Sequence, residues 1–423
     1  MKLKYNIDDK LPIGQQMMYA AQWLILAIAV VSTSVFVAQG SAAEKLFYSQ
    51  KLFAIMGATG LVQVLLGHRL PIVVGPAAVL LVGVISSLGA GAPTTAIYSS
   101  IAIGGLLVTL LTLGNVMRRI QRLFTPRIVI VILMLIALTL APVIKGLIFA
   151  ANPHEGEHIF GLIFTVVGCI AMVILNRTLK GVAKSLVIPI ALVVGSAIYY
   201  WLFPMPASSG TAASLDGVLI DNFTFDWSLV VAFVICYIAL LINDIGSIEA
   251  LGTMLGVEGM ERRLRRGVRI TGIMNILAGA AGVLGPVNYS MSPGVVASTG
   301  CASRWALVPA TLFMIVVALF PDAIFLLTNI PNPVIGVILL FLMGTQLAAG
   351  LEMTHATGSV QSFADGLTVG LPLMMAMLFQ LMPRGILPSV IEPLVGNGFA
   401  MGVIMVIIME HIINRSAKKE AQR

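Results

Sequence analysis

The sequence has little charge and little cysteine. Only 10% of its 423 residues are charged and 58% are hydrophobic, whereas a soluble domain carries about 25% charged residues. Its three cysteines lie far apart inside apolar segments, so they form neither a metal-ligand spacing nor an even disulfide set. It also lacks a phosphate-binding glycine loop, a nucleophile elbow and a metalloprotease motif. The low charge excludes an ordinary soluble domain, and the missing motifs argue against an enzyme. They also argue against an ATP-driven pump, unless a partner supplies the ATPase.

Apolar runs of about 20 residues recur from end to end, and each is long enough to cross a hydrocarbon core about 30 Å thick. Backbone groups inside that core must be satisfied within each segment, so we expect helices, and a β-barrel would instead alternate apolar and polar residues. We predict an all-α polytopic membrane protein with 14 transmembrane segments. Their approximate ranges are 16–38, 48–66, 71–90, 93–116, 126–144, 158–175, 184–203, 227–254, 267–284, 286–302, 305–327, 333–351, 366–382 and 397–413. The first is too long for a cleaved signal peptide, so we expect it to be retained.

The basic residues give the orientation. If both termini are cytoplasmic, 21 of the 25 Lys and Arg residues fall in cytoplasmic loops or tails, which is the positive-inside pattern. We therefore predict a multi-pass protein of the inner (plasma) membrane with both termini in the cytoplasm. Anionic lipid is the partner that such loops attract, so the net charge of +7 does not indicate nucleic acid.

We predict two seven-segment repeats, at 1–205 and 227–423, joined by a polar extracellular or periplasmic linker at 206–226. An odd number of segments per repeat inserts the second repeat upside down, a common plan for secondary transporters. The third segment of each repeat begins with Gly and Pro, as LPIVVGP at 70–76 and GPVNYSMSPG at 285–294. Because Pro interrupts a helix, we predict short extended strands in segments 3 and 10. Matching breaks indicate a binding site, although two kinked packing helices would give the same pattern.

Asp244 is the clear exception among acidic residues that otherwise lie mostly in loops and tails. A carboxylate near mid-membrane is costly unless it is paired or faces water, so we predict that Asp244 couples transport to protons, with Glu249 as a second candidate. Asn243 and Ser247 share one helix face, and Asp244 points about 100° away from Asn243. Only one of these two helix faces can point directly into a central site. The alternatives are a structural Asp244 that caps a broken helix or bonds to backbone groups, and an interfacial Glu249.

The predicted substrate site combines segment eight with both breaks. Its residues are Asn243, Ser247, Ser290, Met291, Ser292, Val74, Gly75, Ala77 and Ala78. The helix after Pro293 would present its amino-terminal amides to the break, which favours anions and polarised carbonyls. The alternative is that Ser292 simply caps this helix.

No metal site and no cofactor are predicted. His154 and His158 stand four residues apart, but Pro153 and Gly156 indicate an exposed loop, and no third ligand is evident. The expected coupling ion is H⁺, with Na⁺ as the alternative.

Five stretches, considered together, resemble one transporter family. They are GHRLPIVVGP at 67–76, RRIQRLFTP at 118–126, RRLRRG at 262–267, SPGVVASTG at 292–300 and IPNPVIG at 330–336. The chain thus resembles the nucleobase–ascorbate transporter family, the xanthine, urate and uracil permeases, over nearly its whole length. This resemblance implies two intertwined inverted repeats, with a core domain of segments 1–4 and 8–11 and a gate domain of segments 5–7 and 12–14. It also implies a homodimer, a site between the strands of segments 3 and 10, and alternating access by movement of core against gate.

Several site positions depart from the family's pattern. The segment-eight Glu of the family falls at Asn243, the acid or His four residues later at Ser247, and the Gln-Asn or Glu-Asn pair at Met291 and Ser292. The aromatic residue of segment three falls at Ala78, and a first-segment Gln-His pair reads Gln22-Trp23. A nucleobase needs paired donors and acceptors and a stacking surface, so these changes bear on the choice of solute.

The leading interpretation is a permease that imports a nucleobase such as xanthine, urate or uracil, or a related small heterocycle, by proton symport. Two alternatives stay open. One is a small-anion transporter of the same fold, and the other is a non-transporting membrane receptor or scaffold. A membrane enzyme is the weakest candidate because no catalytic constellation is present.

Overall fold

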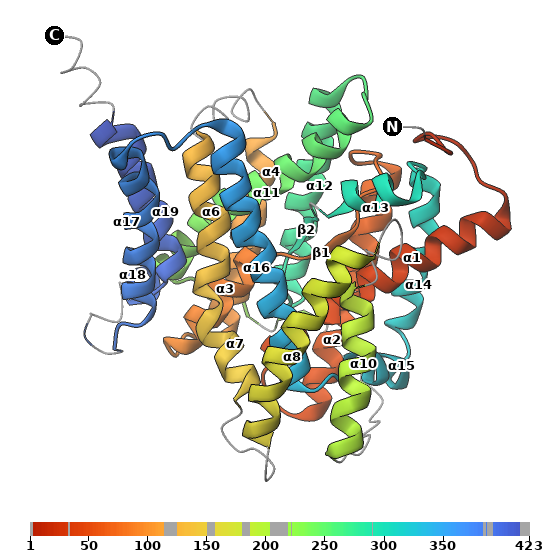
Figure 1. Cartoon of the computed structure of the whole chain (residues 1–423), viewed down its shortest axis with the longest axis horizontal. Helices are drawn as coiled ribbons and strands as arrows, with labels where there is room; N and C mark the ends of the chain where they lie inside the picture. Colours follow the sequence, from red (N-terminus) through yellow and green to blue (C-terminus); the bar gives the residue numbers. More distant parts are fainter. Residues whose placement is uncertain are drawn as a thin grey trace.

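The structure is a computed structural model that describes residues 3–32, 34–113, 125–149, 157–179, 187–203, 219–220, 222–289, 291–383, 386 and 392–414. Most of the described chain is helical. Ser290, His154 and most of the predicted linker at 206–226 lie outside the described residues. In Figure 1 both ends of the described chain lie on the same side of the molecule, towards the top.

One group of helices includes the long helix α11. It comprises α1 (Ile13–Ser32), α2 (Ala42–Leu65), α3 (Ala78–Gly89), α4 (Thr94–Leu111), α11 (Trp227–Met254), α12 (Met260–Ala280), α13 (Ser292–Thr299), α14 (Leu307–Val317) and α15 (Pro321–Thr328), with the 3₁₀ turns η1 (Val35–Val37) and η2 (Arg304–Ala306). In this group α4 packs on α12, α2 on α14, and α11 on α3, α4 and α12. Helices from the first and second halves of the chain therefore alternate within one body.

A second group surrounds α16 and occupies the left and lower parts of Figure 1. It comprises α6 (Pro126–Thr139), α7 (Ala141–Ile148), α8 (Glu157–Thr178), α10 (Val187–Leu202), α16 (Asn332–Thr357), α17 (Phe363–Gln380), α18 (Glu392–Val395) and α19 (Gly398–Ile408), which continues as the π-helical turn η3 (Met409–Ile413). The groups touch through α1 with α10, α3 with α6, and α11 with α18 and α19.

Close packing between α4 and α12 depends on glycine. A Cβ atom at Gly279 would lie 2.4 Å from the backbone N of Ala102 and 2.6 Å from the carbonyl O of Tyr98. A Cβ atom at Gly105 would lie 2.6 Å from the backbone N of Ile276. The two backbones are therefore in direct contact, as small residues allow between helices in a membrane.

Arg127 ties three elements of the second group together. Its guanidinium lies 2.6 Å from Asp365 of α17 and 3.1 Å from Glu410 of η3, and its Nε donates to the carbonyl of Ser359 at 2.7 Å. The three charged side chains are largely shielded, with 10 to 20% of each exposed. One basic group therefore neutralises two acids at the ends of these helices.

Among the described residues, seven helical spans are long and apolar enough to cross a membrane. A further pair, Arg304–Val317 and Pro321–Thr328, passes the same test together but is bent by 109°. The sequence predicted one segment at 305–327 and did not predict a bend within it. It bends because Pro321 begins a new helix after an extended Phe320, so helix α14 cannot continue through this point. The protein is a multi-pass membrane protein.

Candidate functional site

Two short strands pair with each other among the helices of the first group, and the place where they meet is called the crossing. Strand β1 (Val74–Pro76) pairs antiparallel with β2 (Pro286–Asn288), with Val74 opposite Asn288 and Gly75 opposite Val287. Both strands are buried. Pairing satisfies backbone groups that no helix could satisfy beside the prolines. Helices α3 and α13 begin just after β1 and β2, so their amino-terminal ends both lie close to the crossing.

The side chain of Tyr289 lies over the backbone of β1. A Cβ atom at Gly75 would lie 2.6 Å from the ring atom Cε2 of Tyr289, so only glycine fits beneath the ring. The Tyr289 hydroxyl donates to the carbonyl of Pro76 at 2.7 Å. The residue is only partly buried, and an aromatic face of this kind can stack against a flat ring. The predicted site did not include Tyr289, although its aromatic type beside Ser290 was the available signal.

The predicted residues of the strands differ in exposure. Val74, Gly75 and Ala77 are buried, and they contribute to the crossing mainly through their backbone. Ala78 and Met291 are only half-buried, at the first residue of α3 and just before α13. These two positions therefore remain accessible from one side of the crossing.

The Ser292 side chain holds the crossing together. It is fully buried, its hydroxyl donates to the carbonyl of Tyr289 at 2.9 Å, and it accepts from the backbone N–H of Val73 at 3.1 Å. Its hydrogen-bonding capacity is thus used within the protein. The predicted neighbour Ser290 lies outside the described residues.

Helix α11 presents two different faces at the predicted site. Asn243 is half-buried, and a Cβ atom at Gly246 would meet no atom within 4 Å, so this side of the helix is open. Ser247 is buried, and its hydroxyl donates to the carbonyl of Asn243 at 2.7 Å. Glu249 is exposed. Asp244 is fully buried on the other side, against β2. The open face is therefore that of Asn243.

A buried chain of hydrogen bonds ends at Asp244. The backbone N–H and the side-chain amide of Asn288 both donate to Oδ1 of Asp244, at 3.0 and 2.8 Å. Oδ1 of Asn288 lies 3.1 Å from Nε2 of His68, and Nδ1 of His68 accepts from the backbone N–H of Leu70 at 3.0 Å. Thr271 of α12 also faces the Asp244 carboxyl, but Oδ2 forms no hydrogen bond within 3.5 Å among the described residues. Asp244 thus accepts a hydrogen bond from a backbone group, as the structural alternative predicted. Its Oδ2 has no hydrogen-bond partner among the described residues.

His68 and Asn288 are further residues that the predicted site did not include. Both are fully buried. His68 is one of only five histidines and lies between two apolar segments, which was the signal available in the sequence. Its link to Asp244 depends on residues about 180 and 220 positions away, which no local pattern reveals.

Helix α12 fixes the position of β2. Nδ2 of Asn275 donates to the carbonyl of Pro286 at 2.9 Å and to that of Thr271 at 2.7 Å. Oδ1 of Asn275 lies 2.8 Å from the hydroxyl of Tyr237 in α11, which is also 2.8 Å from the carbonyl of Ile101 in α4. Three helices are thereby joined to the strand that carries Asn288.

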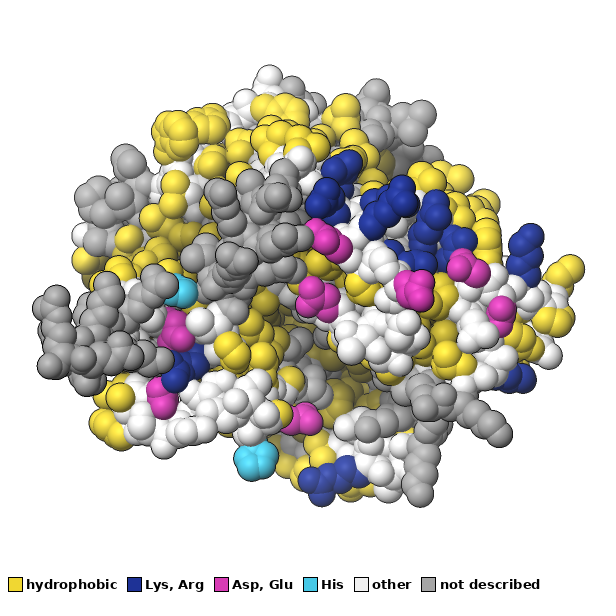
Figure 2. Space-filling model, turned by 90° about the horizontal axis from the view of Figure 1, so that it is seen from above, with side chains coloured by type: hydrophobic (Ala, Val, Ile, Leu, Met, Phe, Trp, Pro, Cys, Tyr) yellow, Lys and Arg dark blue, Asp and Glu magenta, His cyan; other side chains and the backbone are white. Residues whose placement is uncertain are grey.

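Figure 2 shows the face that is uppermost in Figure 1. Lys and Arg side chains gather on one part of this face, and the surface is hollowed near its middle, with hydrophobic side chains at the bottom of the hollow. Basic residues on a membrane protein favour the side that meets anionic lipid and water.

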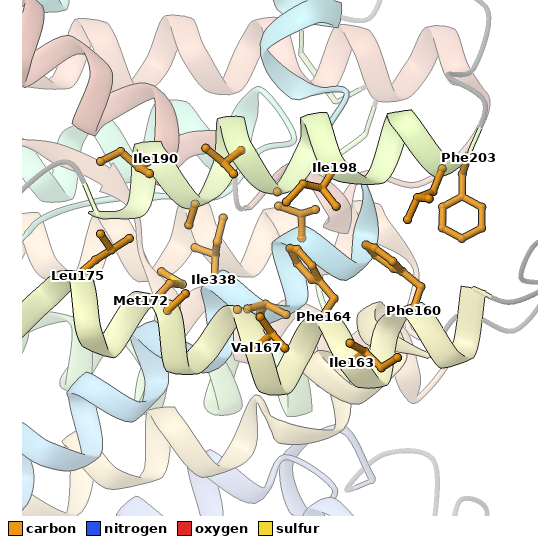
Figure 3. A pocket seen from close by; sticks show the side chains of 18 of the residues that line it. Phe160, Ile163, Phe164, Val167, Met172, Leu175, Ile190, Ile198, Phe203 and Ile338 are labelled. Atoms are coloured by element: carbon orange, nitrogen blue, oxygen red, sulfur yellow. The ribbon is translucent and has the colours of Figure 1, made fainter.

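A separate groove lies between α8 and α10, with α16 at its base (Figure 3). Its volume is about 690 Å³, and every lining residue is hydrophobic or glycine. Phe160, Phe164 and Phe203 line one part of it. A polar solute would find no side-chain partner there, so this groove is suited to lipid chains and not to a polar substrate.

Comparison with solved structures shows a shared fold. The transmembrane domain of the cyanobacterial bicarbonate transporter BicA aligns with a TM-score of 0.61 and 16% identity, covering 87% of this chain and 99% of that one. The murine anion transporter Slc26a9 in its inward-facing state aligns with a TM-score of 0.64 and 15% identity, covering 97% of this chain and 70% of that one.

Sequence comparison then gives the family. The model of the Permease family, Xan_ur_permease, matches residues 14–385. The chain belongs to this permease family, as the motifs predicted, and it is therefore a transporter and not an enzyme. Relatives include the xanthine permease XanP of Escherichia coli, 24% identical over 97% of this chain and 94% of its own length. The uric acid permease PucK of Bacillus subtilis is 26% identical over 88% of each chain.

Proposed function

We propose that the protein is a secondary active transporter that imports a nucleobase such as xanthine, urate or uracil, or a related small heterocycle, by proton symport and alternating access. The observation that carries the proposal is the strand pair β1 and β2 packed against α11, whose Asn243 side is open. The names of the permease relatives support a nucleobase as the solute.

The chemistry of the crossing suits a flat heterocycle. Tyr289 is only partly buried and its ring offers a stacking surface, and half-buried Asn243 offers both a donor and an acceptor. Ala78 and Met291 border the same crossing with small or flexible apolar side chains. A base would stack on Tyr289 and pair its polar edge with Asn243. Ser247 and Ser292 would support this site through their backbone contacts.

The proposed mechanism assigns the first helix group as the core and the second as the gate. The few contacts between the groups support movement of one against the other. The proposal includes 14 membrane crossings, with α3 and α13 as half-length segments completed by the strands. It also includes cytoplasmic termini, an inner-membrane location, a homodimer and Asp244 as the proton-coupling residue.

Uptake into proteoliposomes tests the proposal. Labelled xanthine, urate, uracil and adenine are offered with and without an inward proton gradient. We expect gradient-dependent uptake of one base and a loss of concentrative uptake in Asp244→Asn. No uptake of any base by folded protein, or the same pH dependence of transport in Asp244→Asn as in the wild type, would contradict the proposal.

A small anion is the second candidate substrate. The amino-terminal ends of α3 and α13 near the crossing favour negative charge, and the solved structures of the same fold include a bicarbonate transporter. Inhibition of uptake by anions, but not by purines or pyrimidines, would select this function. Tight binding of a base without any transport would instead indicate a non-transporting membrane receptor.

A further inference from the structure

The hydrogen bonds of His68 fix where its proton lies. Nδ1 accepts from the backbone N–H of Leu70 at 3.0 Å, so this nitrogen carries no hydrogen. In neutral imidazole the hydrogen is then on Nε2, which can only donate. Nε2 lies 3.1 Å from Oδ1 of Asn288 and therefore donates to it.

The fixed tautomer of His68 in turn fixes the amide of Asn288. An asparagine side chain has one accepting and one donating end. Because Oδ1 accepts from His68, Nδ2 must point the other way, and it donates to Oδ1 of Asp244 at 2.8 Å. Rotation of the amide by 180° would place two donors against each other at His68 and two acceptors at Asp244.

Both donors from Asn288 bond to the same oxygen of Asp244, and this leaves Oδ2 for a proton. The Thr271 hydroxyl faces the carboxyl and already accepts from Nε2 of Gln63 at 3.0 Å. It has a second lone pair that could accept a hydrogen from a protonated Oδ2. The carboxylate and the carboxylic acid can therefore both be accommodated with the Asn288 bonds in place.

We propose that His68 is a positioning residue for proton loading at Asp244, acting through Asn288, and that Oδ2 of Asp244 is the atom that takes the proton. Hydronium supplies the proton, an O–H bond forms at Oδ2, and water and a neutral carboxyl result. The role in transport rests on the proposed function, whereas the protonation itself does not.

Few charged groups bear on this chain of bonds. From α12, Nη1 of Arg263 donates to the carbonyl of His68 at 3.0 Å, which disfavours a second positive charge on the imidazole. From α2, the neutral amide of Gln63 approaches Thr271. On α11 itself, Glu249 is exposed. Asp244 forms no ion pair with the described residues, so the state of its charge depends strongly on the two Asn288 donors.

The test uses infrared spectroscopy of the purified full-length protein in detergent over a range of pH. The band of a protonated buried carboxyl that disappears in Asp244→Asn is assigned to Asp244. In His68→Leu the amide of Asn288 is no longer held, so the carboxylate loses a charge-assisted donor. We expect its half-protonation point to rise by about one to two pH units.

His68→Gln serves as the conservative variant, because its amide nitrogen can take the place of Nε2 and donate to Asn288. We expect a half-protonation point close to that of the wild type. His355→Gln, at an exposed histidine of α16, is the matched control and should leave it unchanged. The same shift should appear in the pH profile of proton-driven uptake.

Three results would overturn the proposal. They are a folded His68→Leu protein with the wild-type half-protonation point, equal shifts in His68→Leu and His68→Gln, and no band lost in Asp244→Asn. If the infrared shift occurs but no base is taken up, the positioning role stands and the proposed nucleobase function fails. The two proposals are thus separable.

Discussion

Gly279→Ala would place a methyl group between α4 and α12. The new Cβ atom would lie 2.4 Å from the backbone N of Ala102 and 2.6 Å from the carbonyl O of Tyr98, whereas ordinary contacts need about 3.5 Å or more. Both neighbours are backbone atoms, so no side-chain rotation relieves the clash and the helices must separate. Overpacking of this kind costs about 1–3 kcal/mol, and we expect the upper end of that range here.

The higher helix propensity of Ala offsets about 1 kcal/mol of this cost. The expected net loss of stability is therefore about 2 kcal/mol, which lowers the melting temperature of the detergent-solubilised protein by about 2 °C. The matched control is Gly246→Ala in α11, where the new Cβ atom meets no atom within 4 Å. That variant should melt at or slightly above the wild-type temperature. Equal melting temperatures for the two variants would refute the reasoning. Uptake by Gly279→Ala should also fall, since α12 carries Asn275 and Thr271.

Three further predictions concern the ion pairs of Arg127, the open side of α11 and the contact between Gly75 and Tyr289. Arg127→Gln leaves Asp365 and Glu410 without their shared cation, so we expect a loss of about 1–3 kcal/mol in thermal unfolding, with Arg127→Lys intermediate; a wild-type melting curve for Arg127→Gln would contradict this. Gly246→Trp fills the open side of α11, so uptake should fall at least tenfold while the melting temperature changes little, and unchanged uptake would show that the substrate passes elsewhere. Gly75→Ala places a methyl carbon 2.6 Å from the Tyr289 ring and 2.7 Å from Cγ1 of Val30. Displacement of the ring should weaken the apparent affinity for the base by about tenfold; an equal KM in the variant and the wild type would argue against stacking on Tyr289.

Part of the site was predictable because it depends on local backbone chemistry. Proline and glycine at 71–76 and 285–294 interrupt two apolar segments, and a membrane tolerates such a break only where protein or a cavity surrounds it. Asp244 was identifiable for a similar reason, because a lone carboxyl in an apolar run needs a partner. The bend at Pro321 was missed, although proline marks it, because the apolar run continues across it.

The partners of Asp244 were not predictable from the sequence. Asn288 and His68 meet it only because β1 and β2 cross beside α11, and hydrogen bonds over such separations follow from the tertiary arrangement. The same holds for Tyr289, whose ring finds its place only because Gly75 lies opposite in the paired strand.

The sequence by itself determined the membrane class, the apolar segments and the family, because each depends on composition, run length or contiguous motifs. Only the tertiary structure decided which side of α11 is open. Helical periodicity separates the directions of Asn243 and Asp244, but it does not say which one meets the strands. The packing of α11 against β2 buries Asp244 and leaves Asn243 on the open side of the helix. Which side is buried follows from contacts between segments far apart in the chain.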